Sequence, residues 1–119
     1  MNWIQVQGRR VLDRTRWSWN GFVHVWRSEP SLHQWIVANV LSGGLALYLP
    51  LSPAETAILI MGGILTLAAE CMNTAIERVV DDISTEIRDA AKFAKDAASA
   101  AVALTGIAVG CAWIVILLG

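Results

Sequence analysis

The chain has 119 residues, 55% of them apolar, and a mean hydropathy of +0.52. A soluble domain of this size usually carries less apolar surface, so part of the chain is expected to face lipid rather than water. The two cysteines, Cys71 and Cys111, lie in separate apolar stretches, which excludes a disulfide framework and a zinc knuckle. The net charge is −1, and we expect no nucleic-acid partner.

Residues 1–30 are expected to form an amphipathic helix at the membrane surface. This segment mixes arginine with tryptophan and lacks the short apolar core of a secretory signal peptide. Tryptophan rings settle at the level of the lipid headgroups, where arginine side chains meet anionic lipid. The alternative is a soluble helix packed along the rest of the molecule.

Three apolar stretches follow, and their lengths predict membrane-spanning helices. We place these helices at residues 31–49, 54–80 and 97–118. The first ends where Pro50 and Pro53 remove backbone donors, and the second continues past its uncharged part into acidic residues. Residues 81–96 are expected to form a charged surface helix or loop. The fold class is therefore an all-α membrane protein, with residues 1–119 forming a single domain.

The basic residues predict the orientation. All nine Lys and Arg lie within residues 9–27 and 78–95, and the proline turn between the first two spans has none. Segments rich in Lys and Arg stay on the cytoplasmic side. The N-terminus is therefore expected in the cytoplasm and the C-terminus on the far side of the membrane.

One polar stripe distinguishes the second span from a plain membrane anchor. Glu70, Asn73, Glu77 and Asp81 are spaced 3, 4 and 4 residues apart. At about 100° per residue they share one face of the helix, within roughly 80°. Acids near hydrocarbon are costly unless paired, hydrated or bound to a cation, and few bases lie nearby in the sequence. The stripe favours a divalent metal site, and the alternative is a helix interface with salt bridges to Arg or Lys.

A second polar cluster opens the third span. Lys92, Lys95, Asp96 and Ser99 share one face of the predicted helix, and a lysine is well suited to a phosphate group. Snorkelling at the membrane surface is the alternative for the lysines. The glycine pairs at 43–44 and 62–63 are not followed by Lys-Ser or Lys-Thr, so they indicate close helix contacts rather than a phosphate loop.

These motifs resemble those of the prokaryotic diacylglycerol and undecaprenol kinases. The resemblance covers about residues 10–118. It is carried by Glu70-x-x-Asn73-x-Ala75-Ile76-Glu77-x-Val79-Val80-Asp81, Ala94-Lys95-Asp96-x-x-Ser99-Ala100-Ala101-Val102, and Ser18-Trp19-x-Gly21, Trp26 and Glu29. It implies a homotrimer of three-helix subunits with an amphipathic N-terminal helix in the bacterial inner membrane, the C-terminus being periplasmic.

The resemblance also implies residue roles. Glu70 is expected to be the general base that deprotonates the lipid hydroxyl, and Glu29 and Glu77 to hold the Mg²⁺ that bridges ATP phosphates. Nucleotide contacts are implied for Arg10, Trp17, Glu29, Glu77, Glu86, Ile87, Arg88, Lys95 and Asp96. Contacts with the lipid substrate are implied for Arg10, Gln34, Glu70 and Ser99. Asn73 and Asp81 are expected to support the site.

The expected activity is ATP-dependent phosphorylation of diacylglycerol by direct transfer, a step of phospholipid biosynthesis. Such a transfer needs positioning and charge neutralisation, which two carboxylates on Mg²⁺ with a lysine and an arginine can provide. Gln34 and the tryptophan-rich N-terminus favour diacylglycerol, and undecaprenol is the alternative substrate. Trp17 and Trp35 depart from the enteric members of the family, where a tyrosine and a glutamate stand. A small membrane channel or scaffold is the alternative from another class.

Overall fold

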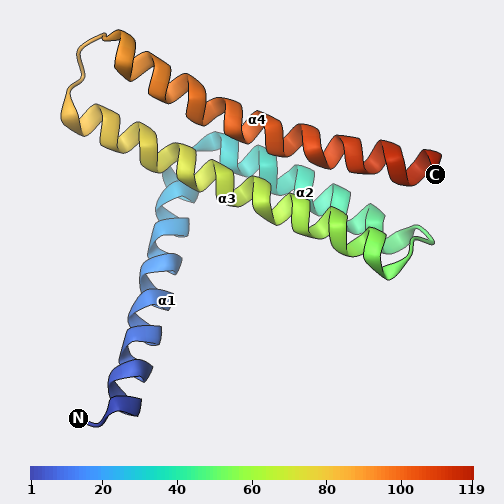
Figure 1. Cartoon of the computed structure of the whole chain (residues 1–119), viewed down its shortest axis with the longest axis horizontal. Helices are drawn as coiled ribbons and strands as arrows, with labels where there is room; N and C mark the ends of the chain where they lie inside the picture. Colours follow the sequence, from blue (N-terminus) through green and yellow to red (C-terminus); the bar gives the residue numbers. More distant parts are fainter.

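The computed structural model describes residues 1–119 and contains four α-helices and no strand (Figure 1). In chain order they are α1 (Trp3–Ser28), α2 (Pro30–Tyr48), α3 (Pro53–Ile83) and α4 (Asp89–Leu118). The all-α class is therefore confirmed. The predicted bounds of α2 agree with the structure to within one residue.

Local capping residues explain where α3 begins. The Ser52 hydroxyl accepts a hydrogen bond from the Glu55 amide, and the Glu55 carboxylate accepts one from the Ser52 amide. This reciprocal pair satisfies backbone donors that the first turn leaves unpaired, and Pro53 occupies the first helical position, where no donor is needed. The predicted turn between the first two apolar stretches is thus confirmed.

The α3–α4 connection is shorter than predicted. Residues 81–96 do not form a separate surface segment, because α3 continues through Ile83 and α4 already begins at Asp89. Only residues 84–88 lie outside a helix. The alanine-rich sequence after Asp89 favours a helix, which carries the charged residues as the first turns of α4.

Helix α3 is the centre of a three-helix bundle. It packs against α2 on one side and α4 on the other, and both neighbours run antiparallel to it (Figure 1). The backbones of α2 and α4 do not approach each other closely. The buried positions of α3 share one face and are Leu59, Gly63, Thr66, Glu70 and Thr74. The predicted close contacts of the 62–63 glycine pair are confirmed, since a Cβ on Gly62 or Gly63 would collide with Val109 or Asn39. Those predicted for the 43–44 pair are not found in this chain, since a Cβ on Gly43 or Gly44 would meet no atom within 4 Å.

Helix α1 projects away from the bundle, and only its C-terminal end joins the other helices (Figure 1). Its only buried residue is Val25, and Trp17 and Trp19 are about two-thirds exposed. At the α1–α2 junction, a ring nitrogen of His33 lies 2.8 Å from the carbonyl oxygen of Trp26 and the two rings are in contact. This arrangement does not match the alternative of a helix packed along the others.

Two helices, α3 and α4, are long and apolar enough to cross a membrane. The surface of the chain agrees with a lipid environment, since large apolar side chains are exposed on all three bundle helices. The 19-residue α2 does not reach the same hydropathy. Its role as a third span is therefore taken up below as a proposal.

Candidate active site

Glu70 is the one buried carboxylate of the chain, with 3% of its surface exposed. It lies on the face of α3 that packs between the neighbouring helices. The Ser31 hydroxyl donates a 2.5 Å hydrogen bond to Oε1 of Glu70. Because Pro30 starts α2 at the preceding position, the beginning of that helix places the hydroxyl beside the carboxylate. The Glu70 carboxylate is thus surrounded by packed helices and accepts a hydrogen bond from one hydroxyl.

Sequence reasoning did not single out Ser31 as a functional residue. Its partner is 39 positions away, so no local spacing connects the two side chains. The only signal in the sequence is that Ser31 follows Glu29 by two residues at the start of a helix. Serine is common at helix starts because it caps them, so this position does not by itself indicate a functional role.

The rest of the acidic stripe continues along α3 beyond Glu70. Asn73 donates to Glu77 through its side-chain nitrogen at 3.3 Å. The Asn73 Oδ1 atom is buried and has no hydrogen-bond partner. Asp81, one turn further, is bound by the Lys95 ammonium of α4 at 2.6 Å. A lysine of the second polar cluster thus contacts the acidic stripe.

Two acids of the implied nucleotide-binding set form ion pairs. Glu29, at the α1–α2 junction, pairs with Arg78 of α3 at 3.4 Å, so this acid does have a basic partner. Arg78 contacts Oε1 of Glu29 and adjoins Glu77 in the chain. Sequence reasoning did not connect these residues, because 49 positions separate them.

Asp96 pairs with Lys92, four residues earlier on α4, whereas Lys95 turns to Asp81. The hydrogen bond to Asp96, together with its negative charge, raises the pKa of Lys92 above its usual value. Because Lys92 is fully exposed, this pair is a surface ion pair that contributes little to stability.

A pocket of about 230 Å³ lies at the α3–α4 connection. Its lining contains five of the residues implied in nucleotide binding, namely Glu86, Ile87, Arg88, Lys95 and Asp96. The Nε atom of Arg88 is buried there without a hydrogen-bond partner, so it remains available as a donor. The structure thus brings these five residues together with Asp81 around one polar cavity.

Four other predicted site residues lie away from the acidic stripe in this single chain. Arg10 and Trp17 are exposed on the projecting α1, and Gln34 and Ser99 are exposed on α2 and α4. No hydrogen bond or ion pair joins any of them to the stripe on α3.

The chain offers few side-chain ligands for a metal ion held by protein alone. No group of three or more His, Cys, Asp or Glu side chains converges in the chain. Mg²⁺ nevertheless needs only one or two carboxylates when substrate phosphates and water complete its octahedron. The unpartnered Oδ1 of Asn73 beside the Glu77 carboxylate is an oxygen of the kind that hard cations accept. The residues therefore fit a metal that arrives with a phosphate ligand.

Comparison with known proteins gives one consistent result. A family model described as prokaryotic diacylglycerol kinase matches residues 16–117, which leaves Arg10 outside the match. The diacylglycerol kinase of Pseudomonas aeruginosa is 41% identical over 113 residues, covering 93% of this chain and 90% of that protein. The diacylglycerol kinase of Escherichia coli strain K12 is 32% identical over 108 residues, covering 91% and 88%. That of Haemophilus influenzae is 32% identical over 104 residues and covers 87% of each chain.

Proposed function

This chain belongs to the prokaryotic diacylglycerol kinase family, and we propose that it phosphorylates diacylglycerol with ATP by direct transfer inside the membrane. The observation that carries the proposal is a similarity that extends over nearly the whole chain rather than over one motif. The named relatives are diacylglycerol kinases, which favours this substrate over undecaprenol and an enzyme over a channel or scaffold.

Glu70 is the proposed general base. It accepts the proton of the free lipid hydroxyl as that oxygen forms a bond to the γ-phosphorus, and the bond from the γ-phosphorus to ADP breaks. Glu70 lies seven residues from Glu77, or about 10 Å along α3, on the side of the apolar segment of the helix. This depth suits an acceptor that comes from the membrane and a nucleotide that comes from water.

Glu77 and Glu29 are the proposed ligands of a divalent metal, with Asn73 beside them. The ion pair with Arg78 uses one oxygen of Glu29 and keeps this acid at the level of Glu77. The metal, when bound, neutralises charge on the ATP phosphates. Mg²⁺ is the expected ion, because two carboxylates with substrate phosphates are its usual environment.

The pocket at the α3–α4 connection is proposed to take the nucleotide. Lys95 and Arg88 supply positive charge to the phosphates, and Glu86, Ile87 and Asp96 line the same cavity. Arg10 and Trp17 stay in the proposed nucleotide set, and Gln34 and Ser99 in the proposed lipid set, on resemblance alone.

We further propose that α2 is a third membrane span and that the enzyme is a homotrimer. Helix α2 is antiparallel to α3 and carries exposed apolar side chains, which supports a position in lipid (Figure 1). The N-terminus is proposed to be cytoplasmic and the C-terminus periplasmic, since all basic residues lie at one end of the bundle or on α1.

The direct test is transfer of labelled phosphate from ATP to a panel of lipid alcohols by the purified protein in detergent. We expect label in phosphatidic acid with dioleoylglycerol and less label with undecaprenol. Label in undecaprenyl phosphate alone would reassign the substrate. No transfer to any alcohol in the presence of Mg²⁺ would reject the proposed activity.

A further inference from the structure

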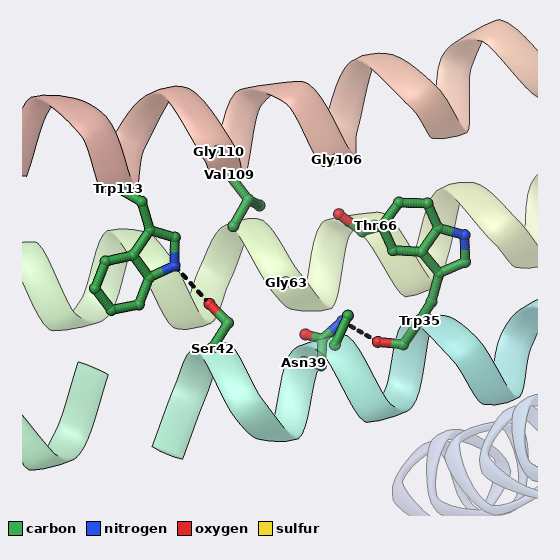
Figure 2. Close-up of a pocket in the computed structure, with 10 residues that line it drawn as sticks. Trp35, Asn39, Ser42, Gly63, Thr66, Gly106, Val109, Gly110 and Trp113 are labelled. Carbon is green, nitrogen blue, oxygen red and sulfur yellow. Dashed lines mark hydrogen bonds between the residues drawn. The ribbon is translucent and has the colours of Figure 1, made fainter. Parts of the chain in front are cut away.

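A groove of about 200 Å³ lies between α2, α3 and α4 (Figure 2). Along α3 it lies on the opposite side of Glu70 from the proposed nucleotide pocket. Gly63 and Thr66 of α3 form its floor. The walls come from the two outer helices and comprise Trp35, Ala38, Asn39, Ser42, Gly106, Val109, Gly110 and Trp113. Nothing in the proposed transfer reaction uses these residues.

The two tryptophans span the gap between α2 and α4 at either end of the groove (Figure 2). The Trp113 indole nitrogen donates a 2.8 Å hydrogen bond to the Ser42 hydroxyl. The ring of Trp35 fits against Gly106, where a Cβ atom would lie 2.7 Å from it. About 10 Å of α2 separates Trp35 from Ser42. These two side chains therefore connect α2 and α4 at the two ends of the groove.

Two of the side-chain donors in the groove are already engaged within the protein. Asn39 donates from its side-chain nitrogen to the Trp35 carbonyl, and its oxygen is turned against Gly63. The Thr66 hydroxyl donates to the Gly62 carbonyl within α3. A ligand in this groove gains little from hydrogen bonds, so the chemistry of the lining selects hydrocarbon.

The groove lies on the same face of α3 as the proposed base, and Trp35 stands at the end of the groove nearer Glu70. Thr66 and Gly63 precede Glu70 by four and seven residues, so all three lie within roughly 60° on one face of α3. A diacylglycerol whose hydroxyl reaches Glu70 must direct its chains toward the apolar part of the bundle. That direction leads past Thr66 to Gly63, along the floor of the groove.

We propose that this groove holds one acyl chain of the lipid substrate and so contributes to the choice of chain length. The inference rests on the proposed function and adds a specificity site to it. The modest volume suits a segment of one chain rather than a whole lipid.

Gly110 offers a clean test. It lines the groove, and a Cβ atom there would meet nothing within 4 Å, so a larger side chain can be added at the groove wall without a clash. Gly44 is the matched control, because it is also free of contacts and lies outside the groove. The two variants Gly110→Leu and Gly44→Leu are compared in detergent micelles with dioleoylglycerol and with dihexanoylglycerol.

Gly110→Leu is expected to raise the KM for dioleoylglycerol about tenfold, which corresponds to displacing about two methylene groups of the chain. The KM for dihexanoylglycerol and the KM for ATP should stay within about twofold of those of Gly44→Leu. Gly110→Ala adds a single carbon and should shift the same constant in the same direction by less.

Several results would contradict the proposal that the groove binds an acyl chain. One is a KM for dioleoylglycerol that is the same in the Gly110→Leu and Gly44→Leu proteins. Equal losses with the long and the short substrate would also overturn it, as would a change of oligomer size in Gly110→Leu, which would assign the groove to a subunit interface. If the wild-type protein phosphorylates neither diacylglycerol, the proposed kinase activity is rejected. That result differs from one in which the wild type is active but the groove does not bind the acyl chain.

Discussion

Glu70 is buried, yet it carries a hydroxyl donor on one oxygen, which leaves the other oxygen for an acceptor alcohol. In Glu70→Gln the Ser31 hydroxyl can still donate to the side-chain oxygen, but the proton acceptor is lost. We expect lipid phosphorylation to fall by about 10²- to 10⁴-fold with ATP affinity retained. Turnover and equilibrium ATP binding in detergent measure both quantities. The control is Glu55→Gln on the same helix, because glutamine also serves in a capping box. A Glu70→Gln enzyme that binds ATP and keeps nearly full turnover would exclude this residue as the base.

Ser31 should matter to stability as well as to geometry. Ser31→Ala leaves a buried carboxylate without its donor, and such a loss costs about 1–3 kcal/mol in the free energy of unfolding. Ser31→Thr keeps the hydroxyl and should recover most of that loss. Denaturant unfolding in detergent micelles compares the two variants with the wild type. Equal stability of Ser31→Ala and wild type would mean that the contact is not formed in solution.

Glu77 tests the proposed metal site. Glu77→Gln should weaken turnover by raising the Mg²⁺ concentration needed for half-maximal rate, and excess Mg²⁺ should restore part of the rate, because a neutral amide oxygen is a poorer ligand for a hard cation. The measurement is the rate as a function of free Mg²⁺ at saturating ATP. Glu55→Gln is again the matched control. An unchanged Mg²⁺ dependence would remove Glu77 from the metal ligands.

The acidic residues could be identified from the sequence, whereas the residues that pair with them could not. A carboxylate such as Glu70 in an otherwise apolar helix stands out by its cost in lipid, and helical spacing connects it to Glu77. The hydroxyl of Ser31 and the guanidinium of Arg78 come from contacts between segments 39 and 49 residues apart. Periodicity within one helix contains no information about such contacts.

At the scale of the element, the first turns of α4 carry the phosphate-binding proposal. Lys95 reaches Asp81 across the helix pair and also lines the proposed nucleotide pocket. Lys95→Ala should raise the KM for ATP by roughly 10- to 100-fold, the loss expected for a charge-assisted hydrogen bond. Lys95→Arg preserves the cation and should stay closer to wild type. Steady-state kinetics against ATP at saturating lipid measure the effect, and an unchanged KM for ATP in Lys95→Ala would place the nucleotide elsewhere.

The sequence predicted the ends of helices correctly where local residues, such as prolines and capping side chains, determine them. The prolines and the cap at Ser52 end one helix and start the next, and the structure confirms this turn. The start of α4 was placed too late, because its charged residues suggested a surface segment. Helix propensity and the pair of Lys92 with Asp96 extend the helix back to Asp89. Charge alone was therefore a poor guide to where the helix begins.

At the scale of the whole molecule, the end of the bundle that carries the basic residues should face the cytoplasm. A reporter fused after Gly119 is expected to score as periplasmic, and one inserted between Ser84 and Arg88 as cytoplasmic. Paired alkaline phosphatase and green fluorescent protein fusions give opposite signals at each position, so each serves as the control for the other. The reverse pattern would contradict the orientation and separate the acidic stripe from cytosolic ATP.

The packing of the bundle is a property that the sequence could not supply. Apolar residues surround α4 on nearly every side, so the pattern does not select the face that meets a neighbour. The choice of α3 as the central helix depends on the small side chains that admit Asn39 and Val109. These are pairwise fits, which appear only when the helices are placed together.

The tryptophans, whose fluorescence can be measured, lie in two separate regions of the molecule. Four of the six indoles lie on the projecting α1, and the other two, Trp35 and Trp113, brace the outer helices of the bundle. In a protein in which both bundle indoles are changed to phenylalanine, tryptophan fluorescence would come from α1 alone. Quenching of that emission by bromine atoms at known depths along a lipid chain would then measure whether α1 enters the bilayer and how deeply, without any added dye.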